Sequence, residues 1–516
     1  MHSTFALMKN VFIDGMYKYN AAPSSPPTTP TERLQGIASS SQQRIWSNLL
    51  TSSTVHNIIL PFSLKHGSMS IDQIQAAIVL ILERHQIFRT AVYYNEQTKQ
   101  LEQKVQPLVD KDAYSFQLTC NPSSSSKQDI NALLIAESKN NFAQIERGLV
   151  FRCHLIKKTS ADDVTHLHTG DLIVFTIHPI AFDVNSITPF VNAFTQAYDQ
   201  SEYHVQSRHY LDFALYEHAR LNDPHHDSKM NQSRRFWSTL MQGYHSHAID
   251  ALPLLSTSNI TPSSGRVHSA VVVLDSNLVD IQMQSALSNN VSMFELGLAC
   301  YFLFLYELTN GQITDWSVTI PTNNRSSADM NSVIGMFTNI VPFRITLEPN
   351  ESFVDLLQRI HQLCLDVHEH ARLPYQEIIS ANTIENNNSF VSTIPFHYEC
   401  SSYGTTMEIK TKDATLNLST MPDCLQNGAT MPHDILLTFQ HDPVARSAHY
   451  VFSCPADKYE ESTLFTISER FQHLLTELFS SSNNTLMIDQ LDRTEKIDDS
   501  QQTIFHRLPH LIHTGE

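Results

Sequence analysis

The residues with the best placement for chemistry are His178 and Asp183, which stand five positions apart just after an apolar run. Both side-chain types transfer protons in enzymes, and a turn carried by a rigid scaffold can present them to a substrate. A lone His at the end of a strand is also common as a structural residue. The spacing therefore leaves a reactive site and a structural turn open as alternatives.

Two regular elements must position these residues. Leu172 to Ile177 is rich in Ile, Val and Phe, which predicts a strand covered on both faces. A helix is predicted from residue 187 to 198, where apolar residues recur at helical spacing and Asn185 or Ser186 can serve as N-cap. Residues 178–184 are therefore a strand-to-helix turn.

Composition excludes several classes of function. The 516 residues predict two lobes, and the net charge of -18 argues against a nucleic-acid partner or an anionic membrane. The seven Cys are scattered without a CxxC pair, so we expect neither a disulfide framework nor a metal site. Reduced cysteines fit a cytoplasmic location.

Several segments need no chemical role. Residues 21–30 are a Pro, Ser and Thr linker, and the longest apolar stretch, 294–308, contains two Glu and predicts a buried helix rather than a membrane span. The DPHHD sequence at 223–227 predicts a polar turn, because adjacent side chains diverge on regular elements.

The turn itself resembles a known signature. HPIAFDV at 178–184 resembles the HHxxxDG motif of condensation domains from nonribosomal peptide synthetases. Aligned without a gap, His178 matches the first His and Asp183 matches the Asp. Pro179 then stands at the second His, which faces the reacting amine in that family, and Val184 stands at the Gly.

Further segments resemble condensation motifs in the family's order. They are SSSQQRIW at 39–46, RHQIFRT at 84–90, YLDFALY at 210–216, IGMFTNIVPFR at 334–344, HARLPYQ at 370–376 and HDILLTF at 433–439. The family forms of the last three are IGxFVNTLPLR, HQDVPFE and an F-D-L strand. Asn324 and Arg325 fall at a family Gly-Arg pair.

The resemblance implies an α/β fold with two chloramphenicol acetyltransferase-like lobes, which have mixed sheets and outer helices and form a V-shaped pseudo-dimer around a central channel. We expect a leader and linker over 1–37, lobes over 38–212 and 213–485, and a polar tail over 486–516. The residues expected to line the channel are Asn324, Arg325, Gly335, Phe337 and Asn339.

The resemblance also implies roles. The catalytic positions are His178 and Pro179, while Asp183 is structural and ion-paired to Arg84 or Arg89. Breaking such a buried pair costs about 3–5 kcal/mol. Relatives join a carrier-tethered acyl or peptidyl donor to an amine acceptor. We therefore expect no bound cofactor, a thioester on a carrier's phosphopantetheine arm, and carrier proteins or neighbouring synthetase modules as partners.

The changed letters of the motif leave three functions open. Proline has no ionisable group and no N–H, so amide formation is expected to be impaired. His178, one residue earlier on a strand, should point to the opposite face, and Val184 should resist a conformation that Gly allows. The alternatives are a working acyltransferase in which His178 compensates, a non-catalytic binding or recruitment module, and a coenzyme A-dependent acyltransferase.

Overall fold

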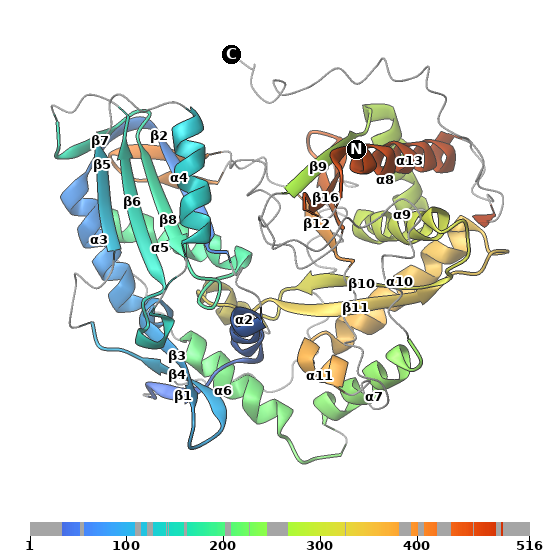
Figure 1. Cartoon of the computed structure of the whole chain (residues 1–516), viewed down its shortest axis with the longest axis horizontal. Helices are drawn as coiled ribbons and strands as arrows, with labels where there is room; N and C mark the ends of the chain where they lie inside the picture. Colours follow the sequence, from blue (N-terminus) through green and yellow to red (C-terminus); the bar gives the residue numbers. More distant parts are fainter. Residues whose placement is uncertain are drawn as a thin grey trace.

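The computed structural model describes residues 33–51, 56–108, 115–120, 127–140, 142, 144–158, 163–201, 208–226, 228–244, 267–325, 327–380, 394–400, 407–419, 435–457, 459–480 and 487–488. The predicted linker at 21–30 and the tail after residue 488 lie outside these ranges. Figure 1 shows two lobes side by side that are joined at their lower ends.

The N-terminal lobe is built around strand β8 (Leu172–Ile177), whose residues are all buried. Phe175 packs in the core under the helices of one face, while Val174 packs with Leu134 of helix α4 on the other. The strand is thus covered on both faces, as predicted. Its buried end delivers the chain into the turn at His178.

The sheet around β8 has seven strands within the described residues. They pair in the order β13 (Glu408–Lys410), β14 (Ala414–Leu418), β2 (Ile58–Ser70), β8, β6 (Phe151–Lys157) and β5 (Ser115–Cys120), and β7 (His166–His168) pairs with β2. The helices of this lobe are α3 (Ile71–Arg84), α4 (Lys127–Lys139) and α5 (Ile187–Asp199).

Helix α3 begins directly after Ser70, whose side chain accepts a hydrogen bond from the backbone N–H of Gln73 and so caps the helix. Helix α5 begins after a short 3-10 turn, η4 (Val184–Ser186). Ser186 precedes α5, but its hydroxyl does not cap the helix. The Ser186 hydroxyl instead forms hydrogen bonds with the backbone of Gly335.

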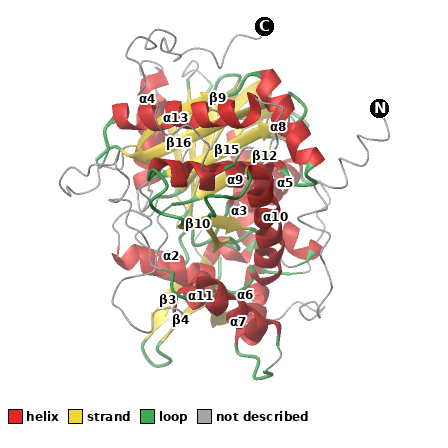
Figure 2. Ribbon diagram, turned by 90° about the vertical axis from the view of Figure 1, so that its right-hand side faces the viewer, coloured by secondary structure: helices red, strands yellow, loops and turns green. Residues whose placement is uncertain are grey.

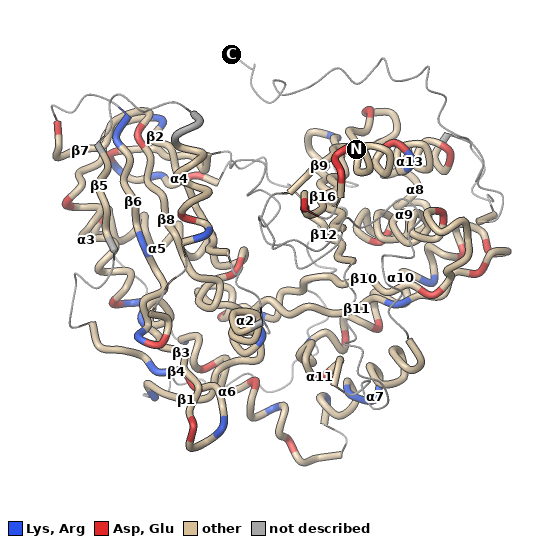
Figure 3. The backbone as a smooth tube through the Cα atoms, in the orientation of Figure 1, with Lys and Arg blue, Asp and Glu red and all other residues tan. Residues whose placement is uncertain are grey.

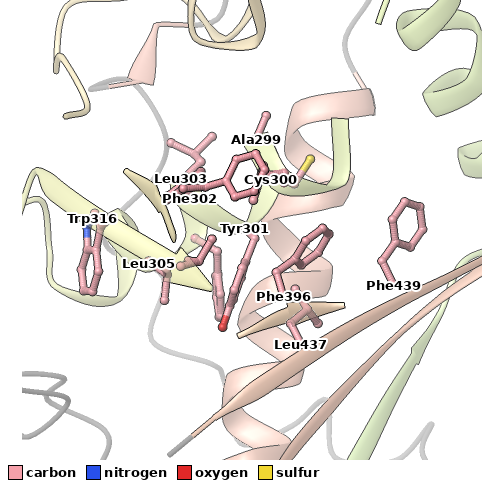
Figure 4. Close-up of a cluster of buried hydrophobic side chains, with 14 of the residues drawn as sticks. Ala299, Cys300, Tyr301, Phe302, Leu303, Leu305, Trp316, Phe396, Leu437 and Phe439 are labelled. Carbon is pink, nitrogen blue, oxygen red and sulfur yellow. The ribbon is translucent and has the colours of Figure 1, made fainter. Parts of the chain in front are cut away.

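The C-terminal lobe is built around α9 (Met293–Leu308), which is buried on almost every side, as the apolar stretch predicted. Figure 4 shows side chains of this core, including Tyr301 of α9 beside Phe396. Gly297 of α9 lies against the Phe439 ring, where a Cβ would come within 2.5 Å. Close packing therefore fixes α9 on its sheet.

Helices and strands of this lobe form two layers, seen from the side in Figure 2. The sheet pairs in the order β12 (Phe396–Cys400), β15 (Leu436–Asp442), β16 (Ser447–Pro455) and β9 (Val267–Val273). The helices packed against it are α8 (Ser276–Ser288), α9 and α13 (Glu461–Ser480). No single described helix is long and apolar enough to cross a membrane.

The lower part of the molecule joins the lobes. Its strands are β1 (Gln35–Ile37), β4 (Gln100–Val105) and β3 (Thr90–Asn95) in one sheet, and β10 (Asp315–Thr322) with β11 (Asn339–Thr346) in another. Its helices are α2 (Ser40–Thr51), α6 (Tyr210–Leu221), α7 (Lys229–Met241), α10 (Phe353–His370) and α11 (Tyr375–Ser380).

The two cores do not divide at one point of the sequence. Strands β13 and β14, which follow α10 and α11 of the second half of the chain, complete the N-terminal sheet through the pairing of β14 with β2. Met330 and Phe337 also pack in the N-terminal core. The predicted boundary near residue 212 therefore does not separate the cores, because later segments cross back.

Candidate functional site

The turn after β8 is held by its own backbone. The N–H of His178 donates to the carbonyl of Val150 at 2.9 Å, and the N–H of Ala181 donates to the carbonyl of His178 at 3.0 Å. Asp183 is extended, with φ -129° and ψ 173°, and the η4 turn follows it. The chain thus presents Asp183 toward the segment that contains Gly335.

The carboxylate of Asp183 forms a bidentate ion pair with Arg325. Arg325 Nη1 donates to Oδ2 and Nη2 donates to Oδ1, each at 2.9 Å. The two side chains are only 2% and 1% exposed. The N–H of Phe337 also donates to Oδ2 at 3.0 Å. Because every contact of the carboxylate is with a donor, Asp183 is organised to hold structure.

This pairing corrects the sequence prediction, which gave Arg84 or Arg89 as the partner of Asp183. Arg89 instead donates to backbone carbonyls of Leu82 and Gln106. The carbonyl of Leu82 belongs to the last turn of α3, where no intrahelical donor remains. Arg89 therefore caps its own helix, and the partner of Asp183 comes from the other half of the chain.

Ser186 is a second anchor of the turn, whereas the sequence predicted only that it could cap the following helix. Its hydroxyl accepts from the N–H of Gly335 at 3.0 Å and from Arg325 Nη2 at 2.9 Å. The Ser186 Oγ lies 2.8 Å from Asp183 Oδ1 and 2.9 Å from the carbonyl oxygen of Gly335, so the hydroxyl can donate its proton to either acceptor. The feature of the sequence that could have indicated this role is the position of Ser186, three residues after Asp183.

His178 is a buried, neutral imidazole. Nδ1 accepts a hydrogen bond from the N–H of Ile180 at 3.1 Å, so the neutral ring carries its proton on Nε2. The ring meets Phe142 edge-on, with centroids 5.9 Å apart. Burial lowers the pKa of His178 to about 3, and the positive charge of Arg152 adds to this effect. The His178 ring is thus uncharged at neutral pH, and its basic nitrogen, Nδ1, already accepts the hydrogen bond from Ile180.

The two changed motif positions lie beside these anchors. Pro179 is half-buried and offers no proton donor or acceptor in its side chain. Val184 is 70% exposed. It is absent from the positive-φ positions found in the described part of the chain. The backbone at Val184 therefore adopts a conformation that valine tolerates, and an effect of Val184 on activity stays a prediction.

The residues predicted to line a channel serve as contacts between segments. Phe337 is fully buried against Tyr210 and Phe213, with the Arg325 guanidinium 4.2 Å above its ring. Gly335 allows the Tyr210 ring to approach, since a Cβ there would lie 2.0 Å from a ring carbon.

Asn339 and Asn324 are buried as well. The Asn339 amide donates to the carbonyls of Ala371 and Leu373 and accepts from the N–H of Tyr375, which ties β11 to the turn before α11. Asn324 is 9% exposed and precedes Arg325. The structure therefore brings the two predicted motifs together, and a channel lined by them stays a prediction.

The comparisons with known proteins agree on one family. A sequence model described as "Condensation domain" matches residues 35–497. The hybrid PKS-NRPS synthetase lepA of Aspergillus flavus is 24% identical over 361 residues, which cover 68% of this chain and 8% of that synthetase. The chain thus spans less than a tenth of this relative's length.

Solved structures share the fold. The X-domain from teicoplanin biosynthesis has a TM-score of 0.75 at 18% identity, covering 91% of this chain and 100% of that chain. The structure of that X-domain in complex with OxyB gives 0.74 at 18% identity, covering 92% and 99%. The condensation domain of the monacolin K polyketide synthase MokA gives 0.69 at 17% identity, covering 88% and 99%.

These neighbours have the α/β fold with two chloramphenicol acetyltransferase-like lobes that the sequence predicted. The family match covers most of the chain, and the Asp183 turn meets the Gly335 segment at the junction of the lobes. This chain therefore belongs to the condensation domain family.

Proposed function

We propose that this chain is a binding or recruitment module of nonribosomal peptide synthesis in which imidazole-assisted amide formation is lost. The observation that carries the proposal is Pro179, which stands at the second His of the motif. Without a side-chain donor or acceptor there, no group at that position can take a proton from an amine.

His178 is a poor substitute. Its Nδ1 already accepts from the N–H of Ile180, and its Nε2 carries the proton of the neutral ring. Accepting a further proton requires the Ile180 bond to break inside a buried site. Losing a general base slows such reactions by about 10²–10⁴-fold.

The scaffold around the missing group is complete. The Asp183–Arg325 pair and the Ser186 hydroxyl tie the turn to the second half of the chain. A domain that keeps this junction can still bind partners without catalysing condensation. The X-domain from teicoplanin biosynthesis, which has been solved in complex with OxyB, offers a precedent of the same fold. Carrier proteins or neighbouring synthetase modules are the partners we propose, because the relative lepA is a large synthetase.

A second candidate is a slow acyltransferase. The junction that positions the turn is intact, and holding two reactants together can supply several kcal/mol of the barrier without a base. The donor would be an acyl thioester on a phosphopantetheine arm or on coenzyme A.

Single-turnover condensation separates the candidates. Synthetic acyl-pantetheine and acyl-coenzyme A donors are mixed with free amines, and amide is measured for wild type, Pro179→Ala, Pro179→His and His178→Ala. We expect wild type and Pro179→Ala to be equally inactive while the donor still binds, and Pro179→His to gain activity. Robust amide formation by wild type that is abolished in His178→Ala would refute the proposal in favour of the acyltransferase.

A further inference from the structure

The main sheets of the two lobes share one topology. In the N-terminal lobe, β2 pairs antiparallel with β8, β8 antiparallel with β6, and β6 parallel with β5. In the C-terminal lobe, β9, β16, β15 and β12 follow the same order of antiparallel, antiparallel and parallel pairing. Each series starts at a strand that leads into a helix, α3 after β2 and α8 after β9. Strand β9 is therefore the counterpart of β2.

These counterparts differ at their outer edges. The outer edge of β2 is covered by β14, and β13 then ends the sheet with the charged side chains of Glu408 and Lys410. Within the residues that the structure describes, no strand pairs with the outer edge of β9. Val267–Val273 contains no Asp, Glu, Lys, Arg or Pro and is drawn in tan in Figure 3. Strand β9 thus lacks the charges and prolines by which edge strands avoid pairing.

The backbone of β9 is oriented for a further strand. The N–H of Leu274 donates to the carbonyl of Ala448 at 3.2 Å, and the register with β16 has no shift. Because alternate residues of an antiparallel ladder bond to the same neighbour, Val271 and Val273 direct their N–H and C=O groups away from β16. Their side chains are 51% and 66% exposed, whereas Val272 between them is buried. Donors, acceptors and apolar surface are therefore available at one place.

We propose that β9 pairs antiparallel with β9 of a second copy of this chain, about a two-fold axis at Val272. This register places Val271 of each copy opposite Val273 of the other, so their outward N–H and C=O groups bond and four valines pack on one face. The patch is self-complementary, as a two-fold interface requires. No carboxylate of β9 opposes the contact, although each copy carries a net charge of -18. The interface does not depend on the function proposed above.

Sedimentation velocity on the full chain, from about 1 to 200 μM, tests this pairing. We expect a dimer with a Kd on the order of 10 μM, because one strand pair is smaller than a standard interface. Val271→Lys and Val273→Lys should each weaken the dimer about tenfold or more, since they bring like charges together at the contact. Val271→Pro should do the same, because it removes an outward N–H and leaves the bonds to β16 in place.

The matched control is Val444→Lys, which changes a valine that is 73% exposed between β15 and β16 and should leave the dimer intact. Equal melting temperatures of the monomers confirm that the lysine variants are folded. A short thiol crosslinker tests the register. A mixture of Val271→Cys and Val273→Cys should crosslink more than either variant alone, with wild type as the background of native thiols.

Three results overturn the proposal. The first is a wild-type chain that stays monomeric over the whole concentration range. The second is a dimer that survives Val271→Lys and Val271→Pro, which places the interface elsewhere. The third is a monomeric wild type that binds a synthetic peptide with the sequence of residues 413–419, which assigns the edge of β9 to a foreign strand.

Discussion

Removing the Asp183 carboxylate should destabilise the chain more than any change at an exposed ion pair. In Asp183→Ala, Arg325 loses its counter-ion while remaining 1% exposed, and the N–H of Phe337 loses its acceptor. Breaking one side of a buried pair costs about 3–5 kcal/mol, and an orphaned buried donor costs about 1–3 kcal/mol within that total. We therefore expect a loss near the upper end, about 4–5 kcal/mol.

Asp183→Asn should cost less, about 1.5–3 kcal/mol, because it keeps one acceptor oxygen. Both carboxylate oxygens accept from Arg325, so the amide nitrogen must replace one of these acceptors, and the remaining oxygen keeps the other hydrogen bond. The variant thus separates loss of shape from loss of charge.

Urea unfolding at pH 7 measures these costs, followed by far-UV circular dichroism and tryptophan fluorescence because two cores can unfold separately. Glu96→Ala, which breaks the exposed Lys99–Glu96 pair, is the control and should have almost no effect. In a double-mutant cycle, Asp183→Ala and Arg325→Ala together should cost about 1–3 kcal/mol less than their sum. Additive costs, or a loss in Asp183→Ala as small as in the control, would show that the pair does not hold the junction.

Two other changes test neighbouring features. Gly335→Ala should cost about 1–3 kcal/mol in the same unfolding assay, because its Cβ would lie 2.0 Å from the Tyr210 ring. The control Gly36→Ala should cost less, because its Cβ would meet the flexible end of the Leu215 side chain at 2.8 Å; equal costs for the two variants would contradict this reasoning. Burial raises the pKa of Glu217 from 4.5 to about 7, so the folded state holds the proton more tightly than the unfolded state. The stability that this proton contributes is complete below pH 4.5 and is lost as the pH rises through 7, a change of up to about 3 kcal/mol. Glu217→Gln should abolish this change in melting curves recorded from pH 5 to 9. A variant with the same pH profile as wild type would refute the role of Glu217.

Local patterns predicted the elements that carry the site. The apolar runs of β8 and α9 depend on residues close in sequence, and each is found where expected. The partner of Asp183 depends on which distant segment crosses the junction, and motif order does not reveal that. Periodicity also does not predict the role of Ser186, because its hydrogen bonds with Gly335 join residues far apart in the chain. The conformation of Val184 could not be inferred from the letter it replaces.

The pairing of β14 with β2 has a consequence for biosynthesis. Strand β2 is translated early, but β14, which pairs with it, exists only after residues 414–418 have been translated. Until then, β2 has an open edge along residues 62–67, and such edges recruit foreign strands. The N-terminal lobe cannot finish folding as a nascent domain, and it must wait for most of the chain to leave the ribosome.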